Sequence, residues 1–178
     1  MNTHMTQQQK IQWFIDRHRA TNHMYEEGVN YEVHLKIVVA MIHKFRHLIP
    51  AEAFNDVELG GWGHDSIEDA RVSYNDIRKV MGVTVAEICF ACTNDKGKNR
   101  SERAGEKYYK GIRDTPYAAF VKLCDRLANV LYSIMTGNTE KTDMYHNENA
   151  KFVKALGLEE FKFHMYQEMF DYLANLFK

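Results

Sequence analysis

The sequence predicts an all-α protein that forms a single domain of about eight helices. Three observations predict this fold: only two residues are proline, the ten glycines are scattered, and Val, Ile and Thr do not alternate with polar residues over any long run. The length of 178 residues suits one domain with a hydrophobic core. Apolar residues make up 45% and charged residues 26% of the chain, as in ordinary globular proteins.

Apolar residues at helical spacing predict the first three helices. One stripe runs through residues 6–22, and a polar turn at 26–30 follows it. A second helix is expected to begin near His34 and to end before Pro50, because proline lacks the amide hydrogen that a helix needs. A third helix is expected over 51–63.

Capping residues predict the next helices. Ser73 and Thr84 each precede an acidic residue by three positions, which is the pattern of a capping box. These boxes predict short helices that end at Gly82 and near Thr93. The polar run 94–100 is expected to be a loop.

Four further helices complete the expected bundle. The first covers 101–110, with its serine as the cap. Asp114-Thr-Pro116 predicts the start of the next, because proline is favoured in a first turn. That helix has a broad apolar face, ends at Gly137 and is expected in the middle of the bundle. The last two are expected over 142–156 and 158–177.

Charge and hydropathy limit the classes of partner. The formal net charge is −1, so no global basic field is present to hold DNA or RNA. No apolar stretch reaches the roughly 18 residues of a membrane span, and the N-terminal residues lack the apolar run of a signal peptide. Three cysteines suggest no disulfide framework, which predicts a reducing, cytoplasmic location.

The run His64-Asp-Ser-Ile-Glu-Asp69 is the most informative feature of the chain. Positions four apart share one face of a helix, so His64 is expected beside Glu68, and Asp65 beside Asp69. One imidazole and three carboxylates within six residues repel one another when partly buried, and a bound cation relieves that cost. A solvated polar turn is the alternative, and the run alone leaves both readings open.

Two candidate metal ligands lie in other helices. His34 opens an apolar helix, and Asp125 lies in the most hydrophobic helix of the chain. A lone aspartate there would be costly to bury unless it were paired. Arg126 could be that partner, and His34 could be a capping or hydrogen-bonded residue. The residues by themselves leave these alternatives open.

In this order the residues resemble the HD-domain metal phosphohydrolases, and most closely the hydrolase domain of RelA/SpoT proteins and the stand-alone small alarmone hydrolases. The segments that carry the resemblance, over roughly residues 11–156, are Tyr31-Glu-Val-His34, Gly63-His-Asp-Ser-Ile-Glu-Asp69, Ser73-Tyr-Asn-Asp-Ile-Arg78 with Met81-Gly82, Thr93-Asn-Asp-Lys96 and Val121-Lys-Leu-Cys-Asp-Arg-Leu-Ala-Asn129. The resemblance implies an HD-type helical bundle, with residues 1–178 forming one HD phosphohydrolase domain.

The resemblance also implies roles for individual residues. The expected ligands of one Mn²⁺ ion, or of another divalent metal, are His34, His64, Asp65 and Asp125. The residues expected to orient and deprotonate the attacking water are Glu68 and Asp69. The residues expected to contact the nucleotide are Asn129, Tyr145 and Arg17.

The implied activity is hydrolysis of a phosphorylated nucleotide, most directly removal of the 3′-pyrophosphate from (p)ppGpp. The chain departs from the family at Leu35, where proline is usual, at Gly61-Trp-Gly63, and at Asn22-His-Met-Tyr-Glu-Glu27, which replaces a basic cluster. The last departure keeps two alternatives open: another substrate, such as a nucleoside monophosphate or NADPH, and a non-catalytic nucleotide-binding module. A homo-oligomer also stays open, since the C-terminal aromatic residues could seal the bundle or meet a second subunit.

Overall fold

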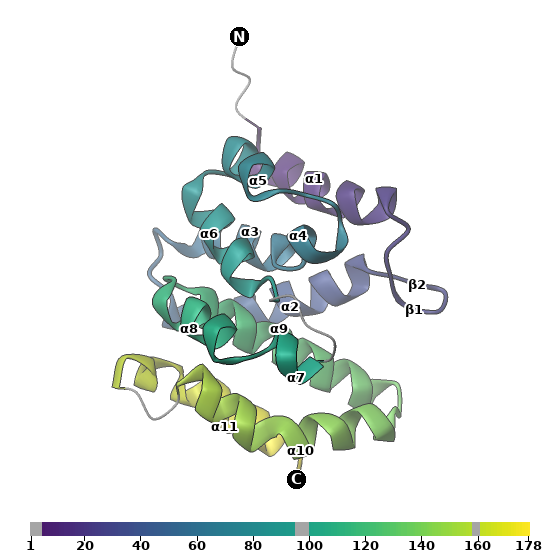
Figure 1. The fold of residues 1–178 in the computed structure, drawn as a ribbon, viewed down its shortest axis with the longest axis vertical. Helices are drawn as coiled ribbons and strands as arrows, with labels where there is room; N and C mark the ends of the chain where they lie inside the picture. Colours follow the sequence, from purple (N-terminus) through teal and green to yellow (C-terminus); the bar gives the residue numbers. More distant parts are fainter. Residues whose placement is uncertain (1–4, 95–99, 158–160) are drawn as a thin grey trace.

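The computed structural model describes residues 5–94, 100–157 and 161–178, and it confirms the all-α prediction with a helical content of 75%. The elements appear in Figure 1 and are, in chain order, α1 (Gln7–Ala20), β1 (Met24–Glu26), β2 (Val29–Asn30), α2 (Glu32–Lys44), a 3₁₀ helix (Arg46–Leu48), α3 (Phe54–Gly63), α4 (Ser66–Asp69), α5 (Tyr74–Met81), α6 (Val83–Cys92), α7 (Arg100–Arg103), α8 (Glu106–Asp114), α9 (Ala118–Met135), α10 (Thr139–Leu156), a second 3₁₀ helix (Phe161–Tyr166) and α11 (Gln167–Asn175). Each helix within the described ranges is too short or too polar to cross a bilayer.

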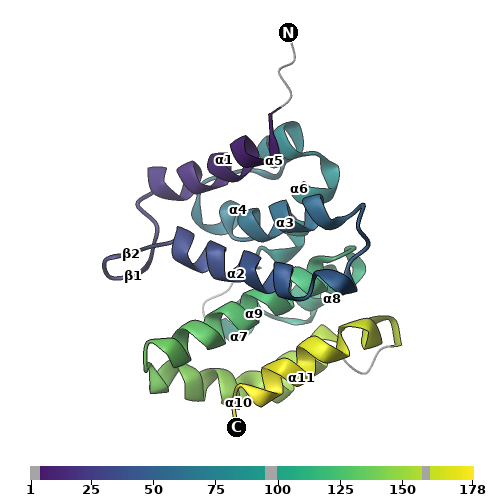
Figure 2. The ribbon, with the colours of Figure 1, turned by 180° about the vertical axis from the view of Figure 1, so that it is seen from behind.

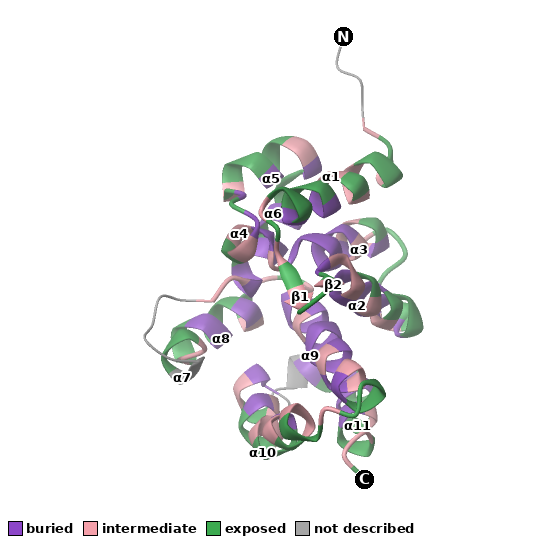
Figure 3. Ribbon diagram, turned by 90° about the vertical axis from the view of Figure 1, so that its right-hand side faces the viewer, coloured by how far each residue is buried: buried purple, intermediate pink, exposed green. Residues whose placement is uncertain are grey.

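The helices are stacked along the long axis of the molecule. Figures 1 and 2 show α1 and α5 at one end, α3, α4 and α6 next to them, α2 and α9 in the middle, and α10 with α11 at the other end. Figure 3 shows α9 as buried along most of its length, as expected for the helix with the broadest apolar face. The prediction that this helix lies in the middle of the bundle is confirmed.

The hydrophobic core consists of two clusters that meet along α2. Leu35 and Val39 of α2 pack into a cluster formed mainly by α1, α3, α5 and α6. Val38 and Ile42 pack into a larger cluster formed mainly by α8, α9, α10 and α11. Since α2 contributes apolar side chains to both clusters, it fixes their relative position and carries the seam between them.

Glycines in α3 allow neighbouring helices to approach closely. A Cβ atom on Gly61 would lie 2.3 Å from Cδ1 of Ile42 in α2, and one on Gly63 would lie 2.4 Å from Phe14 in α1 and 2.8 Å from Sγ of Cys89 in α6. A side chain at either position would displace its neighbours, and Gly63 is the tighter of the two because both a ring and a buried thiol meet the added atom. The unusual Gly61-Trp-Gly63 run is therefore explained by packing, and α3 ends where three other helices converge.

The capping box at Ser73 is confirmed, whereas the one expected at Thr84 is wrong. Ser73 Oγ accepts a hydrogen bond from the amide of Asp76 at 3.2 Å, and the Asp76 carboxylate accepts one from the Ser73 amide at 3.0 Å. Helix α6 begins at Val83, and its N-cap is Gly82 with φ 102°, without a side-chain cap. The left-handed region that Gly82 occupies thus ends α5 and begins α6 without a turn between them.

Two expected helix boundaries in the middle of the chain are wrong. The helix expected over 101–110 is divided into α7 and α8, and Gly105 is the N-cap of α8. Helix α8 continues to Asp114, so Pro116 lies in a connection and not in the first turn of α9. Tyr117, with φ 64°, turns the chain into α9.

The remaining differences lie in connections. Residues 24–30, expected as a polar turn, form a hairpin in which Met24 pairs with Asn30 and Glu26 with Val29, and Gly28 turns with φ 77°. In the helix expected over 158–177, residues 158–160 lie outside the described residues, and a 3₁₀ helix precedes α11. Of the loop expected at 94–100, residues 95–99 also lie outside the described residues. They include Asp95 and Lys96 of one resembled segment.

Candidate metal centre

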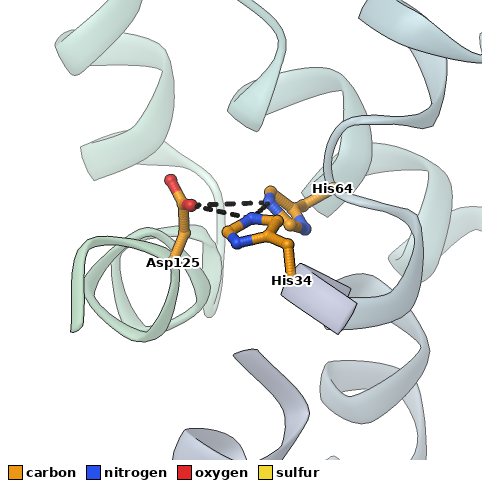
Figure 4. Close-up of side chains that lie close together, drawn as sticks. All are labelled: His34, His64 and Asp125. Carbon is orange, nitrogen blue, oxygen red and sulfur yellow. Dashed lines mark hydrogen bonds and ion pairs between the residues drawn. The ribbon is translucent and has the colours of Figure 1, made fainter. Parts of the chain in front are cut away.

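Three helices bring two histidines and an aspartate to one point. His34 lies in the first turn of α2, His64 follows the last residue of α3, and Asp125 lies in α9. Figure 4 shows their side chains pointing toward one another. Nε2 of His34 lies 3.3 Å from Nε2 of His64 and 3.2 Å from Oδ1 of Asp125, and all three residues are buried.

Asp65 completes the set of four expected ligands. Its Oδ2 lies 2.9 Å from Nε2 of His64 and 3.7 Å from Nε2 of His34. The hydroxyl of Tyr31 donates a hydrogen bond to the same oxygen. The structure thus brings together residues that lie far apart along the chain: His34 and Asp65 are separated by 31 positions, and Asp65 and Asp125 by 60.

The donor set fits a divalent transition metal. Two donors that each lie about 2.1 Å from one ion are about 3.0 to 3.4 Å apart, which is the range of the His34 contacts. Nδ1 of His64 lies 2.8 Å from the Gly61 carbonyl and donates there, so Nε2 is the nitrogen that faces the centre and is available to a metal. The ligand atoms of His34, His64 and Asp125 all lie within 4.8 Å of one another, and Asp65 adds a second carboxylate.

Packing fixes the orientation of the His34 ring. Nδ1 of His34 is buried without a hydrogen-bond partner among the described residues. The ring stacks instead on Tyr25, with ring centroids 4.9 Å apart. Hydrogen bonding therefore sets the rotamer of one histidine, and aromatic contact sets that of the other.

Asp125 has three polar neighbours besides the histidines. Lys122 Nζ lies 2.7 Å from Oδ2, and the Asn129 amide donates to Oδ1 at 2.6 Å. The hydroxyl of Tyr25 in turn donates to Oδ1 of Asn129 at 2.8 Å. Arg126, the alternative partner suggested by the sequence, is paired instead with Glu148 at 3.3 Å.

The electrostatics of the centre favour two ionised carboxylates. Burial disfavours charge on His64, but Asp65 and Asp125 outweigh it and raise the pKa of His64 to about 10. Burial also disfavours the ionised forms of Asp65 and Asp125. The charge of His64 nevertheless lowers the pKa of Asp65, and the charge of Lys122 lowers the pKa of Asp125. Two buried anions side by side form a site that attracts positive charge.

The centre forms one wall of a cavity of about 590 Å³. Expected site residues that line the cavity are His34, Asp65, Glu68, Asp69, Asp125, Asn129 and Tyr145. Basic side chains that line it are Arg103, Lys122, Arg126 and Lys151. The cavity therefore combines the candidate metal centre on one wall with basic side chains around it, a combination that suits an anionic ligand.

The acidic couple faces this cavity from α4. Glu68 is exposed and accepts hydrogen bonds from the side chain and backbone of Asn94, at 3.0 to 3.3 Å. Burial, together with the charges of Asp65 and Glu68, raises the pKa of Asp69 to about 7. His64 is buried, with its Nε2 3.7 Å from Oδ1 of Asp125, whereas Glu68 is exposed and bonded to Asn94.

The structure does not bring Arg17 to the cavity. Arg17 lies exposed on α1, where its guanidinium stacks over Trp13 at 4.8 Å. Tyr145, by contrast, is buried in α10 with the guanidinium of Arg126 4.8 Å from its ring. Arg126 also lies 4.4 Å from the ring of Phe152, so two aromatic rings and Glu148 hold it at the cavity wall.

Several residues at the site were given no role from the sequence. Tyr31 donates a hydrogen bond to Asp65, and Tyr25 donates one to Asn129. The cavity is also lined by Arg103 and Lys151. Tyr31 belongs to the resembled segment that ends at His34, so its place in that segment could have indicated a role at the site. Tyr25, Arg103 and Lys151 follow no motif, and only tertiary packing reveals them.

Sequence comparisons relate the chain to two curated proteins. It is 27% identical over 120 residues to "Guanosine-3′,5′-bis(diphosphate) 3′-pyrophosphohydrolase MESH1" of Danio rerio, which covers 67% of this chain and 64% of that protein. It is 30% identical over 67 residues to the protein of the same name from Drosophila melanogaster, covering 38% of this chain and 37% of that protein.

The chain thus spans slightly less than two thirds of the first relative and little more than a third of the second. No protein-family model matches it. The resemblance read from the motifs is nevertheless confirmed: over two thirds of its length, the chain is similar to a protein named as a guanosine bis(diphosphate) pyrophosphohydrolase.

Proposed function

We propose that this chain is a metal-dependent hydrolase that removes the 3′-pyrophosphate from guanosine 3′,5′-bis(diphosphate). The observation that carries the proposal is the convergence of His34, His64 and Asp125 from three helices, with Asp65 beside them, next to one cavity whose wall includes three of the four, namely His34, Asp65 and Asp125. The names of the two similar proteins support the choice of substrate.

The metal ligands of the proposal are His34, His64, Asp65 and Asp125. Two imidazoles with two carboxylates suit Mn²⁺, and other divalent metals bind the same donors. When bound, such an ion lowers the pKa of a water molecule and offsets negative charge on phosphoryl oxygens. Tyr31, Lys122 and Asn129 hold the two carboxylates in place through hydrogen bonds.

Glu68 and Asp69 are the proposed proton acceptors. Both carboxylates line the cavity, and neither is engaged with the metal-binding histidines through a short contact among the described residues. Hydrolysis requires that the attacking water lose a proton as it reaches phosphorus, and a carboxylate at the cavity wall can accept it. The hydrogen bonds from Asn94 to Glu68 restrict that side chain to one orientation.

The basic residues on the other walls are proposed to bind the phosphates. Arg103, Lys122, Arg126 and Lys151 surround the cavity. Guanidinium and ammonium groups stabilise phosphoryl oxygens through charge-assisted hydrogen bonds. Tyr145 is proposed to contact the nucleotide, whereas Arg17 has no part in the proposal because it lies away from the cavity.

A second candidate is the same hydrolysis on another phosphorylated nucleotide, such as a nucleoside monophosphate or NADPH. The segment 22–27, which replaces a basic cluster of the resembled family, contains no lysine or arginine. In the structure it forms strand β1, and its Glu26 binds Lys141 at 2.7 Å. One source of positive charge for a highly phosphorylated substrate is therefore missing.

A non-catalytic nucleotide-binding role would leave the acidic couple without a purpose.

Metal-loaded protein should release pyrophosphate from ppGpp, and a panel of nucleoside monophosphates and NADPH separates the two candidates. Asp65→Asn should abolish turnover because it removes a ligand charge, and Glu68→Gln should reduce it at least about a hundredfold because it removes a proton acceptor. Absence of pyrophosphate release by the unaltered protein would exclude the first candidate. If both variants retained turnover, the site would not be catalytic.

We further propose a reducing, cytoplasmic setting, since Cys89, Cys92 and Cys124 are all buried free thiols. The proposed partner is a small phosphorylated nucleotide and not DNA or RNA, because the net charge is −1. A homo-oligomer stays an open alternative. Size-exclusion chromatography with light scattering measures it directly.

A further inference from the structure

We propose that His23 is a positioning residue for Asp69, and that His18 fixes the tautomer that His23 needs. This inference rests on the proposed function, in which Asp69 is a proton acceptor. It concerns the segment where this chain departs from the basic cluster of the resembled family. A histidine there would act on the proton acceptor, and not on the phosphates.

His18, His23 and Tyr31 form a stack of three rings beside the metal centre. The ring of His23 lies 3.8 Å from that of Tyr31, and the ring of His18 lies 4.7 Å from it, with interplanar angles of 22° and 20°. Nδ1 of His18 lies 3.1 Å from Nδ1 of His23. Nε2 of His23 lies 3.8 Å from Oδ2 of Asp69. The stack therefore connects a buried histidine on α1 to the acidic couple on α4.

The separation between His23 and Asp69 is an ion-pair distance and exceeds that of a direct hydrogen bond. Catalytic contacts are often this long without substrate and tighten only in the complex. The backbone already holds the two segments together, because the hydroxyl of Thr21 donates to the carbonyls of His18 and Asp69 at 3.0 and 3.3 Å. A small movement of the Asp69 side chain is enough to close the remaining gap.

The charges around His23 determine which of its nitrogens carries the proton. A carboxylate attracts an N–H and repels a lone pair, so Nε2 of His23 is the protonated nitrogen that faces Asp69. Nδ1 of His23 is then an acceptor, and Nδ1 of His18 must be the donor to it. Nε2 of His18 is therefore unprotonated.

The surroundings of His18 agree with this assignment. Nε2 of His18 is buried and has no hydrogen-bond partner among the described residues. A bare lone pair is tolerated there better than an orphaned N–H, which is the rarer state in folded proteins. Burial also lowers the pKa of His18 to about 4, so the ring stays neutral near pH 7 and presents a single donor to His23.

His23 can be replaced without opening a void in the core. Its side chain is 23% exposed, and it lines a second cavity of about 270 Å³ whose wall also includes His18 and Tyr31. Tyr31 belongs to the walls of both cavities. Because Gln and Asn both remove the ring that stacks on Tyr31, a comparison of the two substitutions isolates the contact with Asp69.

A matched pair of variants tests the role of His23. In His23→Gln the side-chain amide can place an N–H where Nε2 stood, whereas in His23→Asn it reaches only the position of Nδ1. His23→Asn should lower kcat for pyrophosphate release from ppGpp at least about tenfold, the weight of one hydrogen bond to a charged group, and leave KM within about twofold. His23→Gln should stay within about threefold of the unaltered protein.

The tautomers are tested separately by ¹⁵N NMR of the histidine side chains in the metal-free protein. The expected spectrum has protonated Nδ1 and bare Nε2 in His18, and bare Nδ1 and protonated Nε2 in His23. The opposite pattern would overturn the inference whether or not the protein is active. If the unaltered protein hydrolyses ppGpp and both variants match it, the inference fails alone. If the unaltered protein hydrolyses nothing, the proposed function fails first, and the tautomer assignment stands or falls by the spectra.

Discussion

Asn129 lies one turn after Asp125 in α9, and its side-chain amide donates a hydrogen bond to Oδ1 of Asp125 at 2.6 Å. That oxygen is the one that lies 3.2 Å from Nε2 of His34. The same amide donates to the Asp125 carbonyl at 3.0 Å, and its oxygen accepts the hydroxyl of Tyr25. Both ends of the Asn129 side chain are therefore occupied in orienting a proposed metal ligand, although the resemblance implied a contact with the nucleotide.

Replacing Asn129 should weaken metal binding before it weakens nucleotide binding. Loss of a residue that orients a metal ligand typically costs ten- to a hundredfold in affinity, so we expect Asn129→Ala to lower Mn²⁺ affinity about tenfold. Titration calorimetry on the metal-free protein measures this effect. Asn147→Ala, on the exposed face of α10, is the matched control. Unchanged metal affinity with a raised KM for the nucleotide would favour a direct contact between Asn129 and the nucleotide instead.

Metal should stabilise the fold through Asp125. The ligands come from both sides of the seam between the two core clusters, so an ion bound to the folded state alone resists their separation. At a free metal concentration one hundred times Kd, the expected gain in the free energy of unfolding is about 2.7 kcal/mol. Thermal melts with and without Mn²⁺ measure it. Asp125→Asn should lose the gain, while Asp143→Asn, on the exposed face of α10, should keep it. An equal shift in both variants would contradict the assigned site.

His18 should make the protein less stable in mild acid. Burial lowers its pKa from 6.5 in the unfolded chain to about 4 in the folded one. Below pH 6.5 the unfolded chain therefore takes up a proton that the folded chain does not, and stability falls with pH until about pH 4. Between pH 8 and pH 5 this difference amounts to about 2 kcal/mol.

Urea unfolding of the metal-free protein at pH 8 and pH 5 tests the effect of His18. His18→Gln removes the titrating group, so its stability should fall by about 2 kcal/mol less than that of the unaltered chain over the same range. The comparison uses the change within each protein, which cancels any packing cost of the substitution. Equal losses in the two proteins would show that His18 is not responsible.

Gly63 should not tolerate even a methyl group. A Cβ there would lie 2.4 Å from the ring of Phe14 and 2.8 Å from Sγ of Cys89, and overpacking of this kind typically costs about 1 to 3 kcal/mol. Gly111 is the matched control, because it lies within α8 and a Cβ there meets nothing within 4 Å. We expect Gly111→Ala to be neutral or to stabilise by up to about 1 kcal/mol. Differential scanning calorimetry of both variants decides the matter, and similar melting temperatures would contradict the packing explanation.

The sequence indicated which residues would gather at the candidate metal centre better than it indicated where helices begin and end. His34 and Asp125 could be chosen because each places a ligating side chain in an apolar helix, and His64 and Asp65 could be chosen because they open a run of crowded acidic residues. Their convergence could only be expected through the resemblance, since periodicity does not say which helices meet. Arg17 was misplaced for the same reason: alignment across a loop does not determine which way α1 presents a side chain.

Local signals failed where the backbone leaves its usual conformations. Nothing in the residues around Tyr117 indicates that a tyrosine adopts φ 64°, and a proline one position earlier suggested a helix start instead. Thr84 followed the capping pattern, but Gly82 had already begun α6. At Ser73 the pattern and the backbone agree, and the prediction is confirmed. Tertiary contacts decide such cases, and a single sequence does not contain them.

The gap between α3 and α4 has a consequence for any attempt to transplant this motif. Neighbouring residues of an uninterrupted helix point about 100° apart, so a histidine and the aspartate after it would diverge on a continuous helix. Here α3 ends at Gly63 and α4 begins at Ser66, and the two intervening side chains reach within 2.9 Å of each other. A scaffold that carried the same six residues on one straight helix would keep the sequence of the motif, but its histidine and aspartate side chains would no longer point to the same place.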